Sequence, residues 1–339
     1  MKTRVWERNG TRLEFTELGM GSAPLGNLYR AITEDEAHAA LHASWEGGVR
    51  FYDTAPLYGL GLAETRLNRF LRDKPRDGYT LATKVGRYME PVPEGQHSGP
   101  GKWFDVPSRR ETFDYTRGGV LRSLDQSFAR LGVERIDILH CHDLDVFNQG
   151  SQEVLEARRA DFLASGIHAL QGLRDQGVVK AIGAGVNEIE AARILVEECD
   201  LDLLLLAGRY TLLEQEALDT LLPLCERRGV GIVLGGPYNS GILATGARQG
   251  AFYNYDPAPA DILERVQRIE AVCERHGVRL IEAALRFPLH HPSVVSVIPG
   301  GQSEAESREN VAIIEAEIPD ALWSDLKSEG LIREDAPTP

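Results

Sequence analysis

Four polar residues with complementary proton chemistry stand at, or shortly after, the ends of short apolar runs. They are Asp53 in FYD, Tyr58 in PLYG, Lys84 in LATK and His142 in IDILHCH. A tyrosine has an ordinary pKa of about 10, so alone it exchanges protons poorly near neutral pH. A neighbouring ammonium favours the phenolate, a carboxylate holds that ammonium, and a histidine orients the reacting oxygen. Together the four would form a proton-transfer device for carbonyl and alcohol chemistry.

Each of these residues also has an ordinary structural explanation when it is taken singly. An aspartate before a turn is often a cap, a lysine at a strand end is usually solvated, and a tyrosine usually packs. The chemical hypothesis therefore depends on whether the fold brings the four side chains together.

Short apolar runs alternate along the chain with segments of helical periodicity. Strands are predicted at Glu14–Leu18, Val49–Asp53, Tyr79–Lys84, Ile136–His140, Val179–Gly183, Leu203–Leu206, Gly231–Leu234 and Val294–Ile298. Helices are predicted at Glu34–Glu46, Glu64–Leu71, Gly119–Leu131, Phe162–Gln176, Glu188–Glu198 and Glu216–Arg228. This alternation predicts a single α/β domain, a (β/α)8 TIM barrel, whose strand ends all meet at one face.

Other segments define the limits of this barrel. Asn9-Gly10, between two alternating stretches, predicts an N-terminal β-hairpin with a type I′ turn. Long connections at 87–117 and 235–293 are expected at the C-terminal face, where loops build substrate pockets. The barrel is predicted over 1–333, with a disordered tail at 334–339. An open doubly wound sheet, the main alternative, would need GxGxxG, whereas Gly19 and Gly21 are followed only by Gly26.

The amino-acid composition excludes several classes of binding partner. The chain has 339 residues and a net charge of −14, which argues against nucleic acid and anionic membranes. The four cysteines form no CxxC pair, and the start MKTRVWERNG has no apolar stretch typical of a signal peptide. These features predict a cytoplasmic protein that acts on a small molecule.

The tripeptide His140-Cys141-His142 leaves a metal site open as an alternative. Residues i and i+2 of a strand face the same way, so both imidazoles could bind one metal, as in barrel hydrolases. Such hydrolases usually carry the pair on the first strand, and no later strand-end histidine completes a site here. We therefore predict no metal.

The sequence resembles the aldo-keto reductase family from about Leu18 to Asn310. FYDTAPLYGLGLAE and ATKVG match family motifs, and the five-residue interval from Asp137 to His142 matches a third. The resemblance implies Tyr58 as general acid–base, Lys84 and Asp53 as the pair that tunes it, and His142 as the residue that orients the substrate oxygen. A barrel kept only as a binding or regulatory subunit is the other possibility, which the intact tetrad disfavours.

The resemblance also implies a nicotinamide cofactor, although several of its contacts are altered. The family pattern IGVSN is replaced by IGAGVN, leaving Asn187 to hold the carboxamide or to cap a helix. The usual glutamine and stacking aromatic align with Ala207 and Gly235, and Tyr210 is a candidate replacement ring. The loop GGPYNSGIL resembles the pyrophosphate-binding loop, and it supplies the predicted cofactor residues Gly236, Pro237, Asn239, Ser240 and Gly241.

The segment IPGGQSEAESREN, which ends at Asn310, is the predicted adenosine end of the site. Two cationic positions of NADP-preferring relatives align here with Gly300 and Glu306. Neither residue helps to bind a phosphate, so NAD is the predicted cofactor, with NADP as the second possibility. Glu306 has a second explanation as a carboxylate in the first turn of a helix. Arg308 would favour NADP if it reached the phosphate.

The motifs GNLYRAI, GLGLAE, HCHDLD and GAGVNE most resemble the branch of the family that oxidises cyclic hemiacetals to lactones. This implies a D-threo-aldose substrate such as L-fucose, L-galactose or D-arabinose, or alternatively pyridoxal. Trp103, Phe104 and Phe113, in the long third loop, are candidates either for packing on a sugar face or for packing within the loop.

Overall fold

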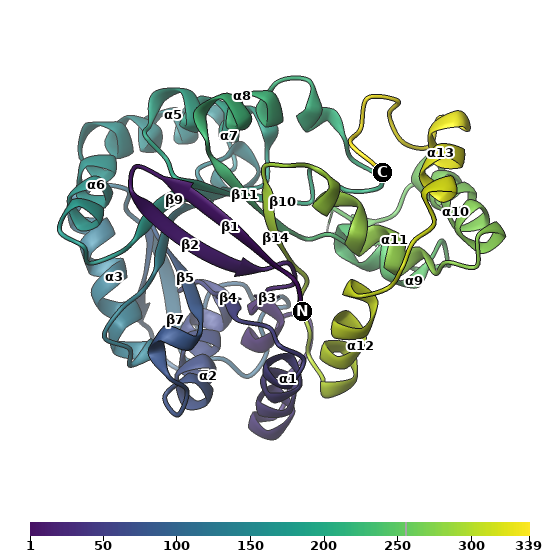
Figure 1. Cartoon of the computed structure of the whole chain (residues 1–339). Helices are drawn as coiled ribbons and strands as arrows, with labels where there is room; N and C mark the ends of the chain where they lie inside the picture. The colour runs from purple at the N-terminus through teal and green to yellow at the C-terminus, as the bar shows by residue number, and fades with distance from the viewer. Residues whose placement is uncertain (255) are drawn as a thin grey trace.

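The computed structural model describes residues 1–254 and 256–339, and it shows a closed barrel of eight strands (Figure 1). In spatial order the strands are β3 (Met20–Gly21), β4 (Phe51–Asp53), β5 (Thr80–Val85), β8 (Ile138–His142), β9 (Ala181–Val186), β10 (Leu203–Ala207), β11 (Gly231–Gly235) and β14 (Val294–Ile298). The paired neighbours run parallel, and parallel bridges from Leu18 to Val297 and from Gly21 to Gly300 close the circle. The predicted (β/α)8 barrel is confirmed.

The prediction was wrong for the first barrel strand. Most of Glu14–Leu18 belongs to the hairpin strand β2 (Thr11–Thr16), and the barrel begins with the two-residue β3. The reason is visible at Gly19, where a Cβ atom would lie 2.7 Å from both Ile298 and Phe51. Glycines at this close approach replace the apolar side chains that normally reveal a strand.

The N-terminal hairpin lies across one end of the barrel, as the two purple strands in Figure 1 show. Strand β1 (Thr3–Arg8) pairs with β2, and the connecting Asn9 and Gly10 both have positive φ, at 50° and 79°, as a type I′ turn requires. The hairpin buries Trp6, Leu13 and Phe15 against inward-facing side chains of the strands. The N-terminal end of the barrel is therefore sealed by apolar packing.

Helices surround the barrel largely where helical periodicity predicts them. The outer layer comprises α1 (Glu34–Glu46), α2 (Leu62–Leu71), α3 (Arg117–Leu131), α5 (Gln152–Asp161), α6 (Ile167–Asp175), α7 (Ile189–Glu198), α8 (Leu221–Arg228) and α12 (Glu304–Ile314). The α1 capping box is present, since Thr33 accepts a hydrogen bond from Glu36 N and the Glu36 carboxylate accepts one from Thr33 N. The predicted helix Phe162–Gln176 starts as a π-turn that continues from α5.

The two long connections carry additional structure. The first folds into an antiparallel pair, β6 (Arg87–Pro91) and β7 (Arg109–Phe113). The second contains β12 (Phe252–Tyr253), β13 (Asp256–Pro257), α9 (Ile242–Thr245), α10 (Ala260–Arg275) and α11 (Leu280–Arg286). After α13 (Asp320–Ser328), the tail at 334–339 mixes exposed residues with one buried residue, Ala336, which is 2% exposed. No described helix is long and apolar enough to cross a membrane.

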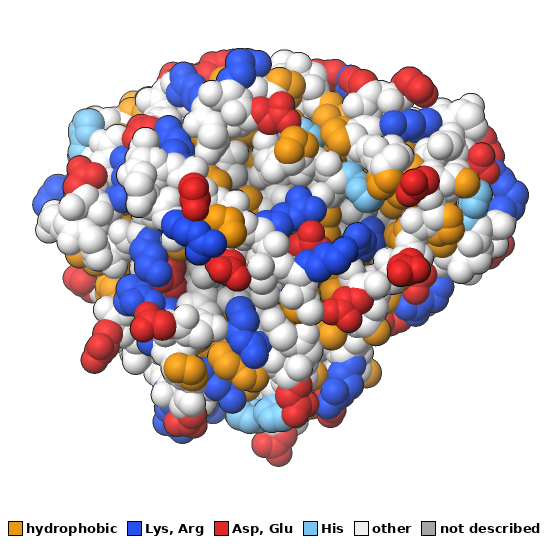
Figure 2. Space-filling view, in the orientation of Figure 1, with side chains coloured by type: hydrophobic (Ala, Val, Ile, Leu, Met, Phe, Trp, Pro, Cys, Tyr) orange, Lys and Arg blue, Asp and Glu red, His pale blue; other side chains and the backbone are white. Residues whose placement is uncertain are grey.

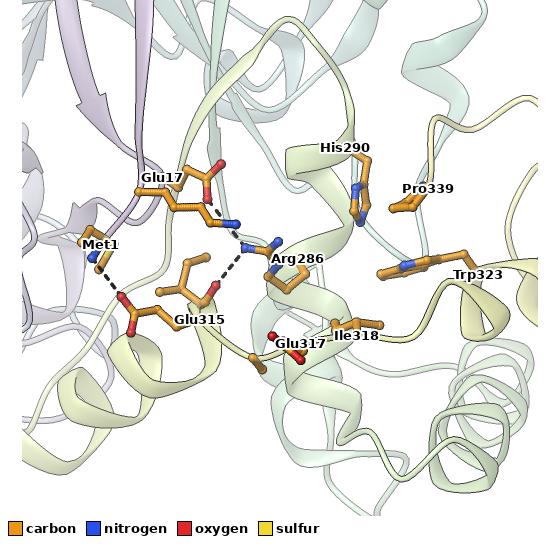
Figure 3. A pocket seen from close by; sticks show the side chains of 12 residues that line it. Met1, Glu17, Arg286, His290, Glu315, Glu317, Ile318, Trp323 and Pro339 are labelled. Atoms are coloured by element: carbon orange, nitrogen blue, oxygen red, sulfur yellow. Dashed lines mark hydrogen bonds and ion pairs between the residues drawn. The ribbon is translucent and has the colours of Figure 1, made fainter.

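The face that carries the hairpin shows Lys, Arg, Asp and Glu intermixed over its surface (Figure 2). It also has a cavity of about 550 Å³, whose lining includes Glu17, Arg286, His290 and Trp323 (Figure 3). Arg286 is already engaged there, since it donates to Ile314 O at 2.9 Å and lies 3.6 Å from the Glu17 carboxylate. None of the predicted catalytic residues lines this cavity, so the site must be sought at the other end of the barrel.

Candidate active site

The predicted lysine–aspartate pair is present in the barrel interior. Asp53 ends β4, and Lys84 lies on the neighbouring β5 with its Nζ 2.5 Å from Asp53 Oδ1. Lys84 also donates to Thr54 O at 2.8 Å. Both charged residues are 1% exposed. A buried ion pair is stable only when the attraction and the hydrogen bonds between its partners offset their loss of hydration. The hydrogen bonds to Asp53 and Thr54 therefore fix the position of the Lys84 ammonium.

The tyrosine and the histidine meet this ion pair at the same barrel mouth. Lys84 Nζ lies 4.8 Å from the centre of the Tyr58 ring. The Tyr58 ring lies 5.9 Å from the His142 ring, at an interplanar angle of 85°. The structure thus brings together all four residues, Asp53, Tyr58, Lys84 and His142, from β4, the loop after it, β5 and β8.

Two glycines on β9 make room for this cluster. Gly183 pairs with His140 and Gly185 with His142 in the parallel register. A Cβ on Gly183 would lie 2.6 Å from His140 Nδ1, and one on Gly185 would lie 3.5 Å from Lys84 Cε. The altered family pattern in this strand therefore accommodates large polar side chains inside the barrel. Glycines within a buried strand were the available sequence signal.

The electrostatics of Tyr58 differ from the sequence expectation. Burial raises its pKa well above the ordinary value, the carboxylates of Asp53 and Asp143 raise it further, and Arg87 opposes them. The Lys84 ammonium is engaged by Asp53, whose own pKa is raised by burial against the effect of the lysine. The predicted net lowering of the tyrosine pKa is therefore absent, and the phenol is the favoured form of Tyr58.

Both histidines of β8 are held neutral. Burial lowers the pKa of His142 well below its ordinary value, and the cations Arg87 and Lys84 lower it further. Burial likewise lowers the pKa of His140 to about 3. His142 Nδ1 and both nitrogens of His140 are buried without a hydrogen-bond partner in the described structure. The described residues contain no group of three or more His, Cys, Asp or Glu that could hold a metal ion.

A groove of about 610 Å³ leads away from Asp53 and Tyr58 across the C-terminal face. Most of the residues predicted to bind the cofactor line it, namely Asn187, Gly236, Pro237, Asn239, Ser240, Gly241 and Gly300. Sequence reasoning missed other lining residues, including Tyr29, Phe147, Arg209 and Phe252. They come from loops whose approach to the groove depends on tertiary structure.

Two amides in this groove have fixed orientations. Asn187 Nδ2 lies 3.2 Å from Asp143 Oδ1 and 3.3 Å from Asp145 Oδ2. Asn187 is not the helix cap of the alternative interpretation, because the capping position of α7 is Glu188. Asn239 accepts from Thr211 Oγ1 at 2.6 Å and donates to Gly208 O at 3.1 Å, so its side chain braces the groove wall.

The residues predicted at the adenosine end lie apart from the groove lining, with the exception of Gly300. Glu306 accepts a hydrogen bond from Gln302 N at 2.8 Å in the first turn of α12, as its second explanation requires. Arg308 pairs with Glu304 at 2.8 Å and with Glu46 of α1 at 3.3 Å. Asn310 accepts from the Tyr238 hydroxyl at 2.7 Å and donates to Gly300 O at 3.3 Å, linking two loops of the groove.

The aromatic residues considered as cofactor or substrate contacts lie in different environments. Tyr210 is fully buried against Phe287 and His291, so the hypothesis that its ring reaches the cofactor is wrong. Trp103 lines a smaller cavity of about 120 Å³, together with Tyr58, Lys84, Lys102 and His142. Phe113 instead packs under the guanidinium groups of Arg87 and Arg158, and Phe104 is absent from the lining of either cavity.

Comparison with known proteins identifies the family. Residues 17–329 match the model of the Aldo/keto reductase family, and the chain belongs to this family. It is therefore an NAD(P)-dependent oxidoreductase. An aldo-keto reductase from Bacillus halodurans, in its holo form, superposes with a TM-score of 0.73 over 100% of both chains at 22% identity, which supports the fold alone.

Two curated relatives are similar to the chain at nearly equal identity. One is a D-threo-aldose 1-dehydrogenase from Pseudomonas sp., 44% identical over 333 residues that cover 96% of each chain. The other is a pyridoxal 4-dehydrogenase from Microbacterium luteolum, 41% identical over 336 residues, covering 95% of this chain and 96% of the relative. An L-galactose dehydrogenase from Arabidopsis thaliana is 29% identical, with 90% of this chain and 86% of the relative covered.

Proposed function

We propose that this chain oxidises a cyclic hemiacetal to a lactone with NAD, and that its substrate is a D-threo-aldose such as L-fucose, L-galactose or D-arabinose. The observation that carries the proposal is the convergence of Tyr58, Lys84 and His142 on a small cavity beside the long groove. The 44% identity to a D-threo-aldose 1-dehydrogenase supports the choice of substrate.

The residues of this cavity fit the required proton transfer. Oxidation removes a hydride from C1 and a proton from the anomeric hydroxyl, which leaves the lactone carbonyl. The phenolate of Tyr58 takes that proton as general base, and the neutral His142 orients the same oxygen. Lys84, fixed by Asp53, stabilises the phenolate that burial disfavours. In the reverse direction the neutral phenol of Tyr58 is the proton donor.

The long groove fits a dinucleotide. Asn187 uses both hydrogens of its amide nitrogen on the carboxylates of Asp143 and Asp145, so it offers a ligand its carbonyl oxygen, the acceptor that a carboxamide –NH2 needs. Gly236 and Gly241 have positive φ and no side chain, so the loop backbone can approach phosphate oxygens closely. A bound nicotinamide supplies the hydride acceptor.

The preference for NAD over NADP is part of this proposal. A 2′-phosphate carries close to two negative charges and needs cationic or strongly donating partners. Gly300 has no side chain to offer, Glu306 is anionic, and Arg308 is engaged by Glu304 and Glu46. None of these three residues is therefore placed to bind the 2′-phosphate of NADP.

Pyridoxal is the second candidate substrate, favoured by the 41% identity to a pyridoxal 4-dehydrogenase. Pyridoxal also forms a ring hemiacetal, so the same proton transfer would give its lactone. The indole of Trp103, which lines the small cavity, would pack on a pyridine ring as readily as on a sugar face.

A substrate screen tests the proposal. Purified protein is assayed with L-fucose, L-galactose, D-arabinose and pyridoxal, following NADH absorbance, with and without a chelator. We expect oxidation of at least one compound to its lactone, undiminished by the chelator. Inactivity on all four, combined with good reduction of open-chain aldehydes, would show that a different substrate class is correct.

A further inference from the structure

Asp143, directly after the histidine of the tetrad, is held in an unusual backbone conformation. Its φ is 53°, in the left-handed region that non-glycine residues seldom occupy, and the residue is 6% exposed. Its N–H donates to Gly185 O at 2.8 Å, and its carbonyl accepts from Gln149 Nε2 at 2.6 Å. Such a conformation persists only when surrounding contacts hold it, and it is typical of functional sites.

The Asp143 carboxylate contacts three side chains at once: an asparagine, a histidine and an arginine. Oδ1 accepts from Asn187 Nδ2 at 3.2 Å, on the side of the long groove. Oδ2 lies 3.3 Å from His142 Nε2, on the side of the small cavity. Oδ2 also accepts from Arg87 of β6 in a short ion pair. One buried carboxylate therefore joins the residues proposed to orient the substrate and the cofactor.

We infer that Asp143 is a positioning residue that sets His142 and Asn187 relative to each other, with Arg87 as its counter-ion. The inference depends on the roles proposed above for Tyr58, His142 and Asn187. Hydride transfer requires donor carbon and acceptor ring to be aligned closely, and small misplacements cost large factors in rate. Because one carboxylate contacts both His142 and Asn187, it restricts the movement of these two side chains relative to each other.

Arg87 fits the role of counter-ion for a buried carboxylate. It is 4% exposed, and it also donates to Glu111 of β7 at 2.7 Å. Burial raises the pKa of Asp143 to about 6, and Arg87 opposes that rise. The charges that act on Asp143 and Tyr58 are Asp53, Lys84, Arg87, Lys102 and Asp145, with His142 adjacent.

The substitution Asp143→Asn tests the inference because it keeps the shape and removes the charge. An asparagine amide cannot accept from Arg87, Asn187 and His142 together, so both orienting residues should lose their alignment. We expect kcat to fall by about tenfold or more, because misplacement of aligned groups can cost up to about a hundredfold in rate, and NADH to bind more weakly. Since the Asp143 carboxylate raises the pKa of Tyr58, the Tyr58 limb of the pH–rate profile should move to lower pH.

Asp145→Asn is the matched control. Asp145 also holds Asn187, through the backbone N at 2.7 Å and Nδ2 at 3.3 Å, and no contact between its carboxylate and His142 is found. This variant should weaken NADH binding and leave the Tyr58 limb of the profile in place. If Asp143→Asn behaves in the same way as Asp145→Asn, with equal loss of affinity and an unmoved limb, the positioning role is overturned.

Arg87→Gln provides a second variant that does not depend on the folding of Asp143→Asn. Without the guanidinium, the uncompensated carboxylate should move the Tyr58 limb to higher pH, opposite to the shift expected for Asp143→Asn. Shifts in the same direction, or no shift for Arg87→Gln, would contradict the inference.

Failure of this inference is distinguishable from failure of the proposed function. NADH affinity is measured by fluorescence without any substrate, so the choice of sugar does not enter. If none of the four hemiacetals is oxidised, the profile is measured on an open-chain aldehyde that the enzyme reduces. Tyr58 then acts as the acid, and the expected directions of both shifts are unchanged.

Discussion

The two ends of the proposed cofactor site are built on different physical principles. At the catalytic end, Asp53 and Lys84 are buried in the barrel and held by bonds of 2.5 and 2.8 Å. At the proposed adenosine end, Glu306 and Arg308 lie outside the groove lining and are exposed, and each is engaged by neighbours on or near α12. Burial makes the first arrangement specific, because unpaired charges there would be costly. Exposure makes the second tolerant of substitution.

This difference explains why motif positions predicted one end better than the other. A buried tetrad functions only with particular side chains, so residue type and spacing carried the information. An exposed helix start can satisfy its own carboxylates by capping, as Glu306 does with Gln302 N. Alignment to a family position therefore did not place that side chain in the groove.

The largest expected effect is at the catalytic end. Tyr58→Phe removes the hydroxyl that exchanges the proton and keeps the ring that faces Lys84 and His142. Turnover should fall at least about a hundredfold, the lower range for general acid–base catalysis, with NADH affinity nearly unchanged. Steady-state kinetics and NADH fluorescence titration provide the measurements. Near-full activity of this variant would contradict the assignment of the tetrad.

The next effect concerns pH. Because the pKa of Tyr58 is raised, the phenolate is scarce at neutral pH, so the oxidation rate should rise with pH into the alkaline range. Lys84→Met leaves the Asp53 carboxylate uncompensated near the phenol, and this should move the rise to still higher pH. The pH dependence of kcat/KM checks both points, and an unchanged profile in Lys84→Met would exclude a tuning role for the lysine.

The smallest effect is expected at the adenosine end. Glu306→Arg should increase the NADP to NAD ratio of kcat/KM, but by no more than about tenfold, which corresponds to about 1.4 kcal/mol. The exposed side chain is held by a helix cap rather than by the groove, so any gain is limited. The same ratio is measured in Arg308→Ala as a control. A wild type that prefers NADP, with Arg308→Ala abolishing the preference, would reverse the proposed roles of these residues.

Periodicity and motif spacing were sufficient for much of the fold and for the catalytic cluster. The α1 boundaries, the hairpin turn and the meeting of Asp53, Tyr58, Lys84 and His142 all followed from local patterns. The sequence did not reveal β3, because the strand has two residues and because Gly19, directly before it, and Gly21 within it lie in close packing against Phe51 and Ile298.

Other features depended on tertiary neighbours that no local pattern encodes. Tyr210 follows a barrel strand as a cofactor contact would, yet it points into the core against Phe287. The raised pKa of Tyr58 results first from burial and then from the carboxylates of Asp53 and Asp143. Neither the burial nor Asp143 is part of a motif centred on the lysine. Asp143 itself reads as an ordinary turn residue until its contacts with His142 and Asn187 are known.

The hairpin that covers the N-terminal end of the barrel has a consequence for access to the barrel interior. Trp6, Leu13 and Phe15 pack across the strands at this end, whereas the two described cavities that Asp53 or Lys84 lines lie at the C-terminal mouth. Substrate and cofactor would occupy that same mouth. If Tyr58 takes up the substrate proton as proposed, we expect that proton to leave by the route through which the ligands enter, and the catalytic pair to re-equilibrate with solvent between turnovers.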